Sequence, residues 1–242
     1  MIRTLHWRCF RLVATARLRR LGGRLVVEAR GTPRLRGPLR LETGPRPGTL
    51  TLRVGRDVTI GRECVLDLAD GADGLVELGD GAVLQSRVRL QPWGGVIRVG
   101  AGAQVRDGCE LKSKGELRIG DRAICGRNAT VHCHSAVTIG DDVGLAERVT
   151  ITDSDHANDG SDTWFMDQPV HADEVVLGRN VFCATNAVVL RGTRIGANSV
   201  VAAGAVVTGG EHPSGWLIGG VPAKPLKSLA GARHDDPSLP LR

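Results

Sequence analysis

The sequence predicts an all-β solenoid, in which short strands wind into coils that stack on one another. The main observation is a buried-type residue that returns every six positions in the C-terminal part of the chain. Its members are Leu177, Cys183, Val189, Ile195, Val201 and Val207. Four positions after each of the first five stands a small or β-branched residue, namely Val181, Ala187, Thr193, Ser199 and Ala205. A period of six fits neither an α-helix nor an alternating strand, so it indicates a repeated supersecondary unit.

Two further observations support this fold class. The first is that the six-residue period also runs upstream, where glycine often follows the recurring buried-type residue, which we call the anchor. The upstream anchors are Val54, Ile60, Leu66, Leu78, Leu84, Leu90, Val99, Val105, Leu111, Ile119, Cys125, Val131, Val137, Ile139, Leu145 and Ile151. The second is composition, because the 242 residues are 41% apolar but only 3% aromatic, with 33 Gly and no Tyr, which suits a narrow interior. We expect each hexad to form one flat side and three sides to close an 18-residue coil.

The chain begins with a basic N-terminal arm. Residues 1–40 contain eleven Arg and one acidic residue, a net charge of +10, whereas the 21 basic and 25 acidic residues that follow give −4. An apolar stripe on one face of a predicted helix over residues 1–21 comprises Ile2, Leu5, Cys9, Leu12, Val13 and Ala16, flanked by Trp7 and Phe10. This helix either caps the open strand edge of the solenoid or lies on an anionic membrane surface. No nucleic-acid partner is expected, because the arm has no recognisable nucleic-acid-binding fold.

Composition and period also predict the domain boundaries. Residues 1–48 form the arm and a Pro/Gly-rich linker (31–48), residues 49–212 form the repeat, and residues 213–242 form a C-terminal coenzyme-binding segment and tail. Four of the six cysteines occupy repeat positions: Cys64, Cys109, Cys125 and Cys183. We interpret them as small buried side chains in a reducing compartment. No apolar run reaches the length of a membrane span, and the start is too interrupted for a secretory signal, so we expect a cytoplasmic protein.

The period breaks at length once, between the anchors Ile151 and Leu177. This interruption, the predicted catalytic loop 152–176, begins with Asp-Ser-Asp-His at residues 153–156 and continues with Trp164, Phe165, Met166 and His171. Loops on a rigid scaffold often contain the functional site. His156 is the main candidate, because a neutral imidazole accepts a proton from a hydroxyl or amine while that atom attacks a thioester carbonyl.

Residues 151–156, followed by a renewed Leu-Gly hexad, resemble the catalytic-loop entry of the maltose and galactoside O-acetyltransferase group of hexapeptide-repeat acyltransferases. The resemblance covers roughly residues 50 to 227. It implies a left-handed parallel β-helix, with His156 as general base in direct acyl transfer from a coenzyme thioester. Asp153 and Asp155 are assigned to the substrate side, where a carboxylate can fix the imidazole tautomer, although turn chemistry explains both equally well. The family's acceptor-binding Asn falls on Gly126, which leaves the acceptor open.

Three later segments resemble the coenzyme-binding coils of the same family. They are residues 180–187 (NVFCATNA), 202–208 (AAGAVVT) and 219–224 (GGVPAK). By position, the family's coenzyme contacts carry over to Phe182, Thr185, Ala203, Thr208, Lys224 and Lys227. Small residues let pantetheine lie along exposed backbone amides, and the two lysines meet the nucleotide phosphates. Phe182 replaces the usual Trp, and Gly209 and Gly210 stand where the family often has Lys.

The resemblance implies a homotrimeric O-acyltransferase that uses acetyl-CoA as cosubstrate and acts on a sugar or surface-polysaccharide precursor. The alternatives are an N-acetyltransferase of an amino sugar, a zinc enzyme similar to gamma-class carbonic anhydrase, and a non-catalytic solenoid scaffold. The zinc alternative would use His132 and His134. Because zinc catalysis needs about three protein ligands and an open position, no metal is expected at this pair.

Overall fold

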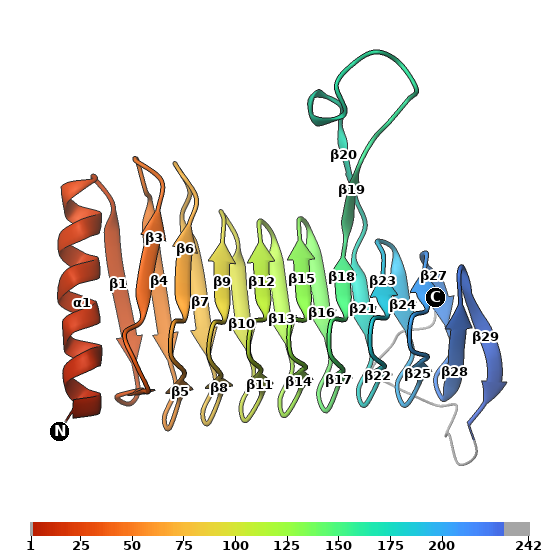
Figure 1. Ribbon diagram of the computed structural model, residues 1–242, viewed down its shortest axis with the longest axis horizontal. Coiled ribbons are helices and arrows are strands. Elements are labelled where there is room, and N and C mark those ends of the chain that lie inside the picture. The colour runs from red at the N-terminus through yellow and green to blue at the C-terminus, as the bar shows by residue number, and fades with distance from the viewer. Residues whose placement is uncertain (1, 230–242) are drawn as a thin grey trace.

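Three β-sheets, parallel except for the last strand of the second, form the three sides of a solenoid, and one helix covers its N-terminal end (Figure 1). The computed structural model describes residues 2–229. The first sheet contains β1 (Arg24–Ala29), β4 (Thr49–Val54), β7 (Gly74–Leu78), β10 (Val96–Val99), β13 (Glu116–Ile119), β16 (Ala136–Ile139), β21 (Val175–Leu177), β24 (Thr193–Ile195) and β27 (Gly210–His212). The second contains β2 (Arg34–Leu35), β5 (Thr59–Ile60), β8 (Val83–Leu84), β11 (Gln104–Val105), β14 (Ile124–Cys125), β17 (Gly144–Leu145), β22 (Phe182–Cys183), β25 (Val200–Val201), β28 (Trp216–Gly220) and β29 (Ala223–Ser228). The third contains β3 (Arg40–Thr43), β6 (Val65–Leu68), β9 (Arg89–Pro92), β12 (Glu110–Ser113), β15 (Thr130–Cys133), β18 (Thr150–Thr152), β23 (Val188–Val189) and β26 (Val206–Val207).

The anchors of the repeat stack on one another because each strand pairs in parallel with the strand of the next coil. Ile119 of β13, for example, pairs with Val99 on one side and Ile139 on the other, and all three are buried. Buried and partly exposed residues alternate along the strands, as the two faces of a pleated strand require. The anchors therefore form one continuous hydrophobic core along the solenoid, and the predicted all-β solenoid is confirmed.

The predicted coil length holds only near the C-terminal end. There, Val176 pairs with Arg194, which lies 18 residues later. In the middle of the solenoid Val96 pairs with Glu116, which lies 20 residues later. The longer coils have four-residue strands in the third sheet, and β12 accordingly buries Ser113 as well as its anchor. The hexad rule misses this second inward residue because it counts one anchor per side.

Left-handed backbone conformations at the corners explain the turn residues of the repeat. Asn128, Asn186 and Asn198 have φ values of 55°, 61° and 59°, and Gly204 has a φ of 68°. Asparagine and glycine adopt this region at lower cost than most residues. Because the corners stack, their side chains also meet, and Asn180 Nδ2 donates a hydrogen bond of 2.8 Å to Asn198 Oδ1.

The cysteines behave as small core side chains. Cys64, Cys109, Cys125, Cys133 and Cys183 are buried and unpaired, whereas Cys9 is exposed. Burial raises the pKa of the Cys109 and Cys133 thiols to about 11 and that of Cys183 to about 12. A thiol with so high a pKa is protonated at neutral pH, so the predicted packing role is confirmed for the four cysteines placed on the repeat.

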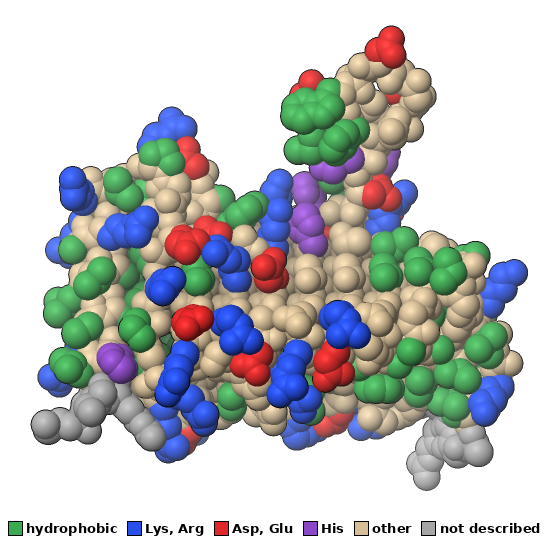
Figure 2. All heavy atoms as spheres, in the orientation of Figure 1, with side chains coloured by type: hydrophobic (Ala, Val, Ile, Leu, Met, Phe, Trp, Pro, Cys, Tyr) green, Lys and Arg blue, Asp and Glu red, His purple; other side chains and the backbone are tan. Residues whose placement is uncertain are grey.

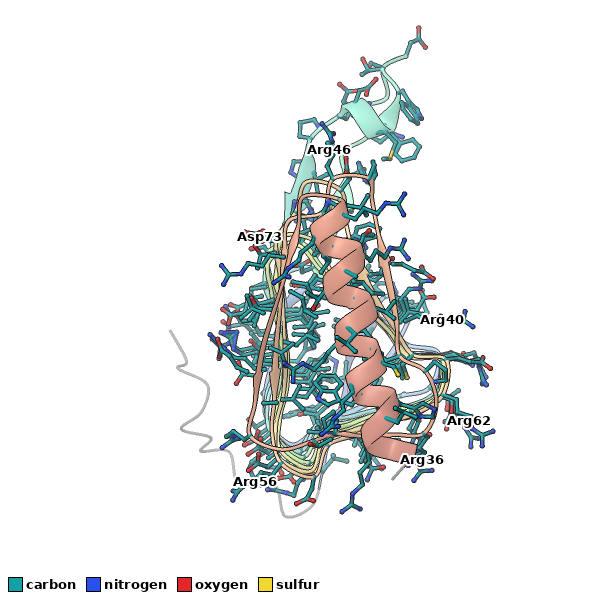
Figure 3. The ribbon with its side chains drawn as sticks, turned by 90° about the vertical axis from the view of Figure 1, so that its left-hand side faces the viewer. Arg36, Arg40, Arg46, Arg56, Arg62 and Asp73 are labelled. Carbon is teal, nitrogen blue, oxygen red and sulfur yellow. The ribbon has the colours of Figure 1, made fainter. Side chains whose placement is uncertain are left out.

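Helix α1 (Ile2–Arg20) lies across the N-terminal end of the solenoid, as Figure 3 shows. Its buried face consists of Trp7, Phe10, Ala14 and Leu18, which join the core formed by the coils. Arg17 Nη1 also donates a hydrogen bond of 3.1 Å to the carbonyl of Leu41. The helix covers the apolar end of the core, so its capping role is confirmed.

The predicted apolar stripe is nevertheless on the wrong face of α1. Leu5, Leu12 and Val13 are 57%, 73% and 67% exposed. Cys9 and Ala16 are exposed as well, and the side chain of Ile2 lies outside the described residues. The buried face is built instead on the two aromatic residues that flank the predicted stripe, because an aromatic side chain covers more apolar area than a Leu or Val.

The solenoid also begins before the predicted boundary at residue 49. Strands β1, β2 and β3 form a complete first coil and pair in parallel with β4, β5 and β6. The Pro and Gly residues of the predicted linker lie between these strands. Arg24 pairs with Thr49, which lies 25 residues later, so this first coil is too long for the hexad period. At the other end β28 and β29 extend the second sheet beyond residue 212. Residues 230–242 of the predicted tail lie outside the described residues.

Candidate active site

The long interruption of the repeat is a hairpin that projects from the solenoid (Figure 1). It leaves the third sheet after β18 and returns to the first sheet at β21. Its two arms, β19 (Ser154–His156) and β20 (Val170–Ala172), are antiparallel and place His156 opposite Val170. A single turn of 3-10 helix, η1 (Phe165–Asp167), forms part of the tip.

One buried amide organises the tip of the hairpin. The Oε1 atom of Gln168 accepts a hydrogen bond of 3.0 Å from the backbone N–H of Asp159, and its Nε2 donates one of 3.0 Å to the carbonyl of Thr163. Gln168 is only 8% exposed, although its neighbours in the tip are exposed. The tip therefore has a defined shape, in spite of its distance from the hydrophobic core.

The imidazole of His156 is exposed and rests against an aromatic ring. Phe165 meets it edge-on, with ring centroids 5.5 Å apart and planes at 90°. Trp164 meets Phe165 in turn at 6.0 Å. Within residues 2–229, no side chain or backbone group forms a hydrogen bond with either imidazole nitrogen. Both nitrogens are thus available to a substrate, as a general base requires.

Asp153 has a structural role that the sequence did not reveal. Its carboxylate is fully buried and accepts backbone N–H bonds from His134 (2.6 Å), Ser135 (2.7 Å) and Ala136 (2.8 Å) of the preceding coil. Both oxygens are occupied and point away from solvent. The assignment of Asp153 to the substrate side is therefore corrected: this carboxylate fixes the base of the hairpin to the corner of the coil beneath it.

Asp155 likewise makes no hydrogen bond to His156. Its carboxylate accepts a hydrogen bond of 2.8 Å from Arg191 Nε, and the same guanidinium binds Asp173 at the other arm of the hairpin. These two ion pairs brace the hairpin against the next coil, and they explain why a corner residue of the repeat is Arg. Asp155 is exposed, unlike Asp153, so it remains accessible to a substrate beside the ion pair.

A basic column runs along the third sheet to the foot of the hairpin. The sheet register aligns Gln91, Lys112, His132 and Thr152 on its outer face. Lys112 lies over the ring of Trp93, with its Nζ 4.2 Å from the centroid. Neither Lys112 nor Lys114 has a salt-bridge partner among the described residues. Figure 2 shows histidine side chains at the foot of the projecting hairpin, with Lys or Arg side chains beside them.

The surroundings of His132 favour its neutral form. Burial lowers the pKa of His132, and the positive charge of Lys112 lowers it further, against an opposing effect of Asp153. Burial also lowers the pKa of Lys112 itself. A neutral imidazole can hydrogen-bond a hydroxyl group, and the neighbouring lysine can pair with an anionic group.

The coenzyme candidates gather mostly at the C-terminal end. The outer face of the second sheet aligns Gly144, Phe182, Val200 and Leu217, with Lys227 on the edge strand. The ring of Phe182 lies over Gly144, where a Cβ atom would stand 3.1 Å from its Cδ2. Ala203, Lys224 and Lys227 are exposed, and the carbonyl of Thr185 accepts a hydrogen bond from Gly204 at the corner next to Ala203.

Thr208 lies apart from the other coenzyme candidates. It follows β26 in the third sheet, whereas Phe182 belongs to the second sheet. The hairpin with His156 leaves the third sheet at the same corner, two strands earlier. A single chain therefore places His156 and Thr208 at one corner of the solenoid. The outer face of the second sheet around Phe182, which we call the Phe182 surface, lies on another side.

Sequence reasoning missed the structural residues of the site. Arg191 and Gln168 are ordinary in the sequence, and only their contacts reveal their roles. Lys112 could have been noticed, because lysine is rare in this chain: there are only four, two at residues 112 and 114 and two at residues 224 and 227.

Within the described part of the chain, no group of three or more His, Cys, Asp or Glu side chains could hold a metal ion. No helix among residues 2–229 is long and apolar enough to cross a membrane.

No protein-family model matches the chain. It is 30% identical over 156 residues to the probable acetyltransferase Rv3034c of Mycobacterium tuberculosis. The matched residues make up 64% of this chain and 50% of that protein. It is 40% identical over 63 residues to the 2,3,4,5-tetrahydropyridine-2,6-dicarboxylate N-acetyltransferase of Staphylococcus aureus, which covers 26% of each chain. The chain thus spans half, or less, of the length of these relatives.

Two solved structures share the solenoid. LpxA from Acinetobacter baumannii has a TM-score of 0.54 at 13% identity, with 84% of this chain and 72% of that chain covered. A mutant of AntD, an N-acyltransferase from Bacillus cereus in complex with dTDP and coenzyme A, has a TM-score of 0.54 at 16% identity, with 63% and 83% covered. With the six-residue period and the three parallel sheets, these matches decide the fold. The chain is a parallel β-solenoid built on a six-residue repeat.

Its sequence relatives are acetyltransferases, so the resemblance that the repeat and motifs indicated is confirmed. The chain departs from a bare solenoid at two places. One is the hairpin that carries His156, and the other is helix α1 at the N-terminal end. The hairpin holds an available imidazole beside aromatic side chains, and the column with Lys112 and His132 ends at its foot, so it is the candidate active site among the described residues.

Proposed function

We propose that this hexapeptide-repeat protein is an acyl-CoA-dependent O-acyltransferase that transfers an acetyl group to a saccharide. The observation that carries the proposal is the exposed imidazole of His156, held on a projecting hairpin with both nitrogens available. The acetyltransferase relatives give the reaction class. Neutral imidazole is the common general base for activating a hydroxyl group at neutral pH.

In the proposed reaction, His156 accepts the proton of an acceptor hydroxyl as that oxygen forms a bond to the acyl carbon. The carbon–sulfur bond of the thioester breaks, and the departing thiolate takes the proton from the imidazolium. The base returns to its neutral form, and no atom is oxidised or reduced. Phe165 limits the positions that the imidazole can take, which reduces the entropy that must be lost at the moment of transfer.

The residues at the C-terminal end fit a coenzyme. Phe182 is 46% exposed although it is a large apolar side chain, and Lys224 and Lys227 have no carboxylate partner among the described residues. Phe182 would contact the apolar part of pantetheine, the corner at Thr185 and Ala203 would lie along its amides, and the lysines would pair with phosphates. Acetyl-CoA supplies the activated acyl group.

A homotrimer would complete the site. Within one chain, His156 and Thr208 share a corner that differs from the Phe182 surface. If the Phe182 surface of one subunit faces the hairpin of its neighbour, a single thioester reaches both sets of residues. The exposed apolar side chains of the hairpin tip, Trp164 and Met166, would then be covered by the neighbouring subunit.

A sugar or surface-polysaccharide precursor is the proposed acceptor, and the cytoplasm, with peripheral contact at the inner membrane face, is the proposed location. Saccharide hydroxyls match the exposed polar rim of the hairpin and the outward column with Lys112 and His132. An amino-sugar nitrogen is the alternative nucleophile, because the same base serves either atom.

The test begins with calorimetric binding of CoA and acetyl-CoA to the wild-type protein and to His156→Ala. We expect both proteins to bind, and only the wild type to release thiol from acetyl-CoA across a panel of neutral, acidic and amino sugars. Mass spectrometry of the product separates O-acetyl from N-acetyl transfer. If the folded wild-type protein binds neither CoA nor acetyl-CoA, that result would contradict the acyltransferase proposal and favour a scaffold.

A further inference from the structure

The outer face of α1 is apolar and basic at the same time. Leu5, Leu12 and Val13 are more than half exposed, although the opposite face already caps the core. Arg8, Arg19 and Arg20 are exposed too, and none has a salt-bridge partner among the described residues. No acidic residue occurs in the helix. A cap for a solenoid end needs only one apolar face, so this second face is unexplained by packing.

The rim of the solenoid end extends the positive charge. Figure 3 shows α1 across the end, with Arg36, Arg40 and Arg62 beside it. These three arginines also lack a salt-bridge partner among the described residues. Residues 1–40 have a net charge of +10, whereas the rest of the chain has −4. The positive charge of the molecule is therefore concentrated at one end.

We propose that this end docks on a bilayer of anionic phospholipid, with the outer face of α1 as the contact. Leu5, Leu12 and Val13 would enter the boundary between headgroups and acyl chains, while the arginines would pair with lipid phosphates. A bilayer of this kind would therefore contact both the apolar and the basic side chains of the surface. A nucleic acid would use the arginines and leave the apolar centre exposed, and a second copy of the same face would place unpaired arginines against each other.

The charge distribution also orients the molecule. An anionic surface attracts the arginine-rich end and repels the net negative remainder, so the solenoid stands upright on the bilayer. In the third sheet, β18 is the fifth strand after β3. With strands about 4.8 Å apart and a helix about 10 Å in diameter, the hairpin base stands roughly 35 Å above the bilayer. Docking would thus present the hairpin to acceptors that extend from the membrane or lie in solution near it, and would keep it away from lipid headgroups.

Co-sedimentation of the full chain with vesicles tests the docking. The vesicles contain phosphatidylcholine either alone or mixed with phosphatidylglycerol. We expect binding only to the mixed vesicles. Leu12→Ser with Val13→Ser should reduce it at least about tenfold, because these side chains supply the apolar contact. Val221→Ser with Leu226→Ser is the matched control, since those residues are 72% and 60% exposed at the other end of the solenoid. Absence of wild-type binding, or equal losses in the two double variants, would overturn the proposal.

Charge is tested separately with two triple variants of equal net charge. Arg8→Gln, Arg19→Gln and Arg20→Gln together should weaken binding about 100-fold, from about fivefold per arginine at an anionic surface. The control triple replaces Arg87, Arg106 and Arg148, which are also without a salt-bridge partner among the described residues but lie on the coils. Equal weakening by both triples would assign binding to net charge alone and overturn the role of α1.

The upright orientation can be measured with a fluorophore on a thiol. Cys9 is the exposed cysteine of α1, and a label there should be quenched by brominated lipid. In a Cys9→Ser background, a label on Ser161→Cys, an exposed tip residue of the hairpin, should stay unquenched. Quenching at both positions would show a solenoid lying flat and overturn the orientation. None of these measurements requires acyl transfer, so their outcome is independent of the proposed reaction.

Discussion

Phe165 meets the imidazole of His156 edge-on, with their ring centroids 5.5 Å apart. The pair lies on a hairpin that the hydrophobic core does not reach, so the ring supplies the packing that would otherwise orient the histidine. Edge-to-face pairs of this kind contribute about 0.5–1.5 kcal/mol beyond burial. The site therefore depends on contacts within the hairpin as well as on the solenoid that carries it.

The first prediction concerns the proposed base. His156→Ala should lower kcat for acetyl transfer about 10²–10⁴-fold, the usual contribution of a positioned general base. His171→Ala is the matched control, because His171 is an exposed histidine on the other arm of the same hairpin. Steady-state thiol release measures both, and equal losses in the two variants would remove His156 from the role of base.

The second prediction concerns the buried carboxylate of Asp153. Asp153→Asn should destabilise the protein by about 3 kcal/mol, since an amide cannot accept three N–H bonds and one buried donor loses its partner. Asp155→Asn should cost less than about 1 kcal/mol, because the ion pair with Arg191 is exposed. Urea unfolding of the two variants gives the comparison. A similar loss for both would contradict the structural role of Asp153.

The third prediction concerns the electrostatics of the basic column. Burial lowers the pKa of His132 and the charge of Lys112 lowers it further, so Lys112→Gln should raise that pKa. NMR titration of the imidazole C–H resonances measures the shift. Lys227→Gln removes the same charge from another part of the protein, and a matching shift in that variant would rule out the local effect.

A related pH effect concerns stability. Burial lowers the pKa values of His132 and His212 in the folded protein. As pH falls below about 6.5, these histidines take up protons in the unfolded chain before they do so in the folded one. The free energy of unfolding should therefore decrease from that pH downwards, until the lower pKa of the folded state is passed. Urea titrations at several pH values measure this decrease, and it should be smaller in His132→Gln.

The last prediction concerns the thiols. Five cysteines are buried, and Cys9 on α1 is exposed. A thiol reagent at neutral pH should modify about one thiol per folded chain and all six in denaturant, because burial keeps the others protonated and inaccessible. Rapid reaction of more than one thiol in the folded protein would contradict the packing of the core.

The sequence by itself determined the solenoid, its core and the place of the hairpin. These are local properties: each six-residue side buries its own anchor, as happens with Ile119 and Ile195, and a break of the period shows in the chain whatever its surroundings. Tertiary structure alone decided the rest. The buried face of α1 depends on the shape of the end that Trp7 fills, and the first coil escaped notice because its sides exceed six residues. The two aspartates next to His156 differ because the coil below presents three N–H groups to Asp153, while Arg191 of the coil above reaches Asp155. Such partners come from residues far away in the sequence, so only the stacking of the coils assigns them.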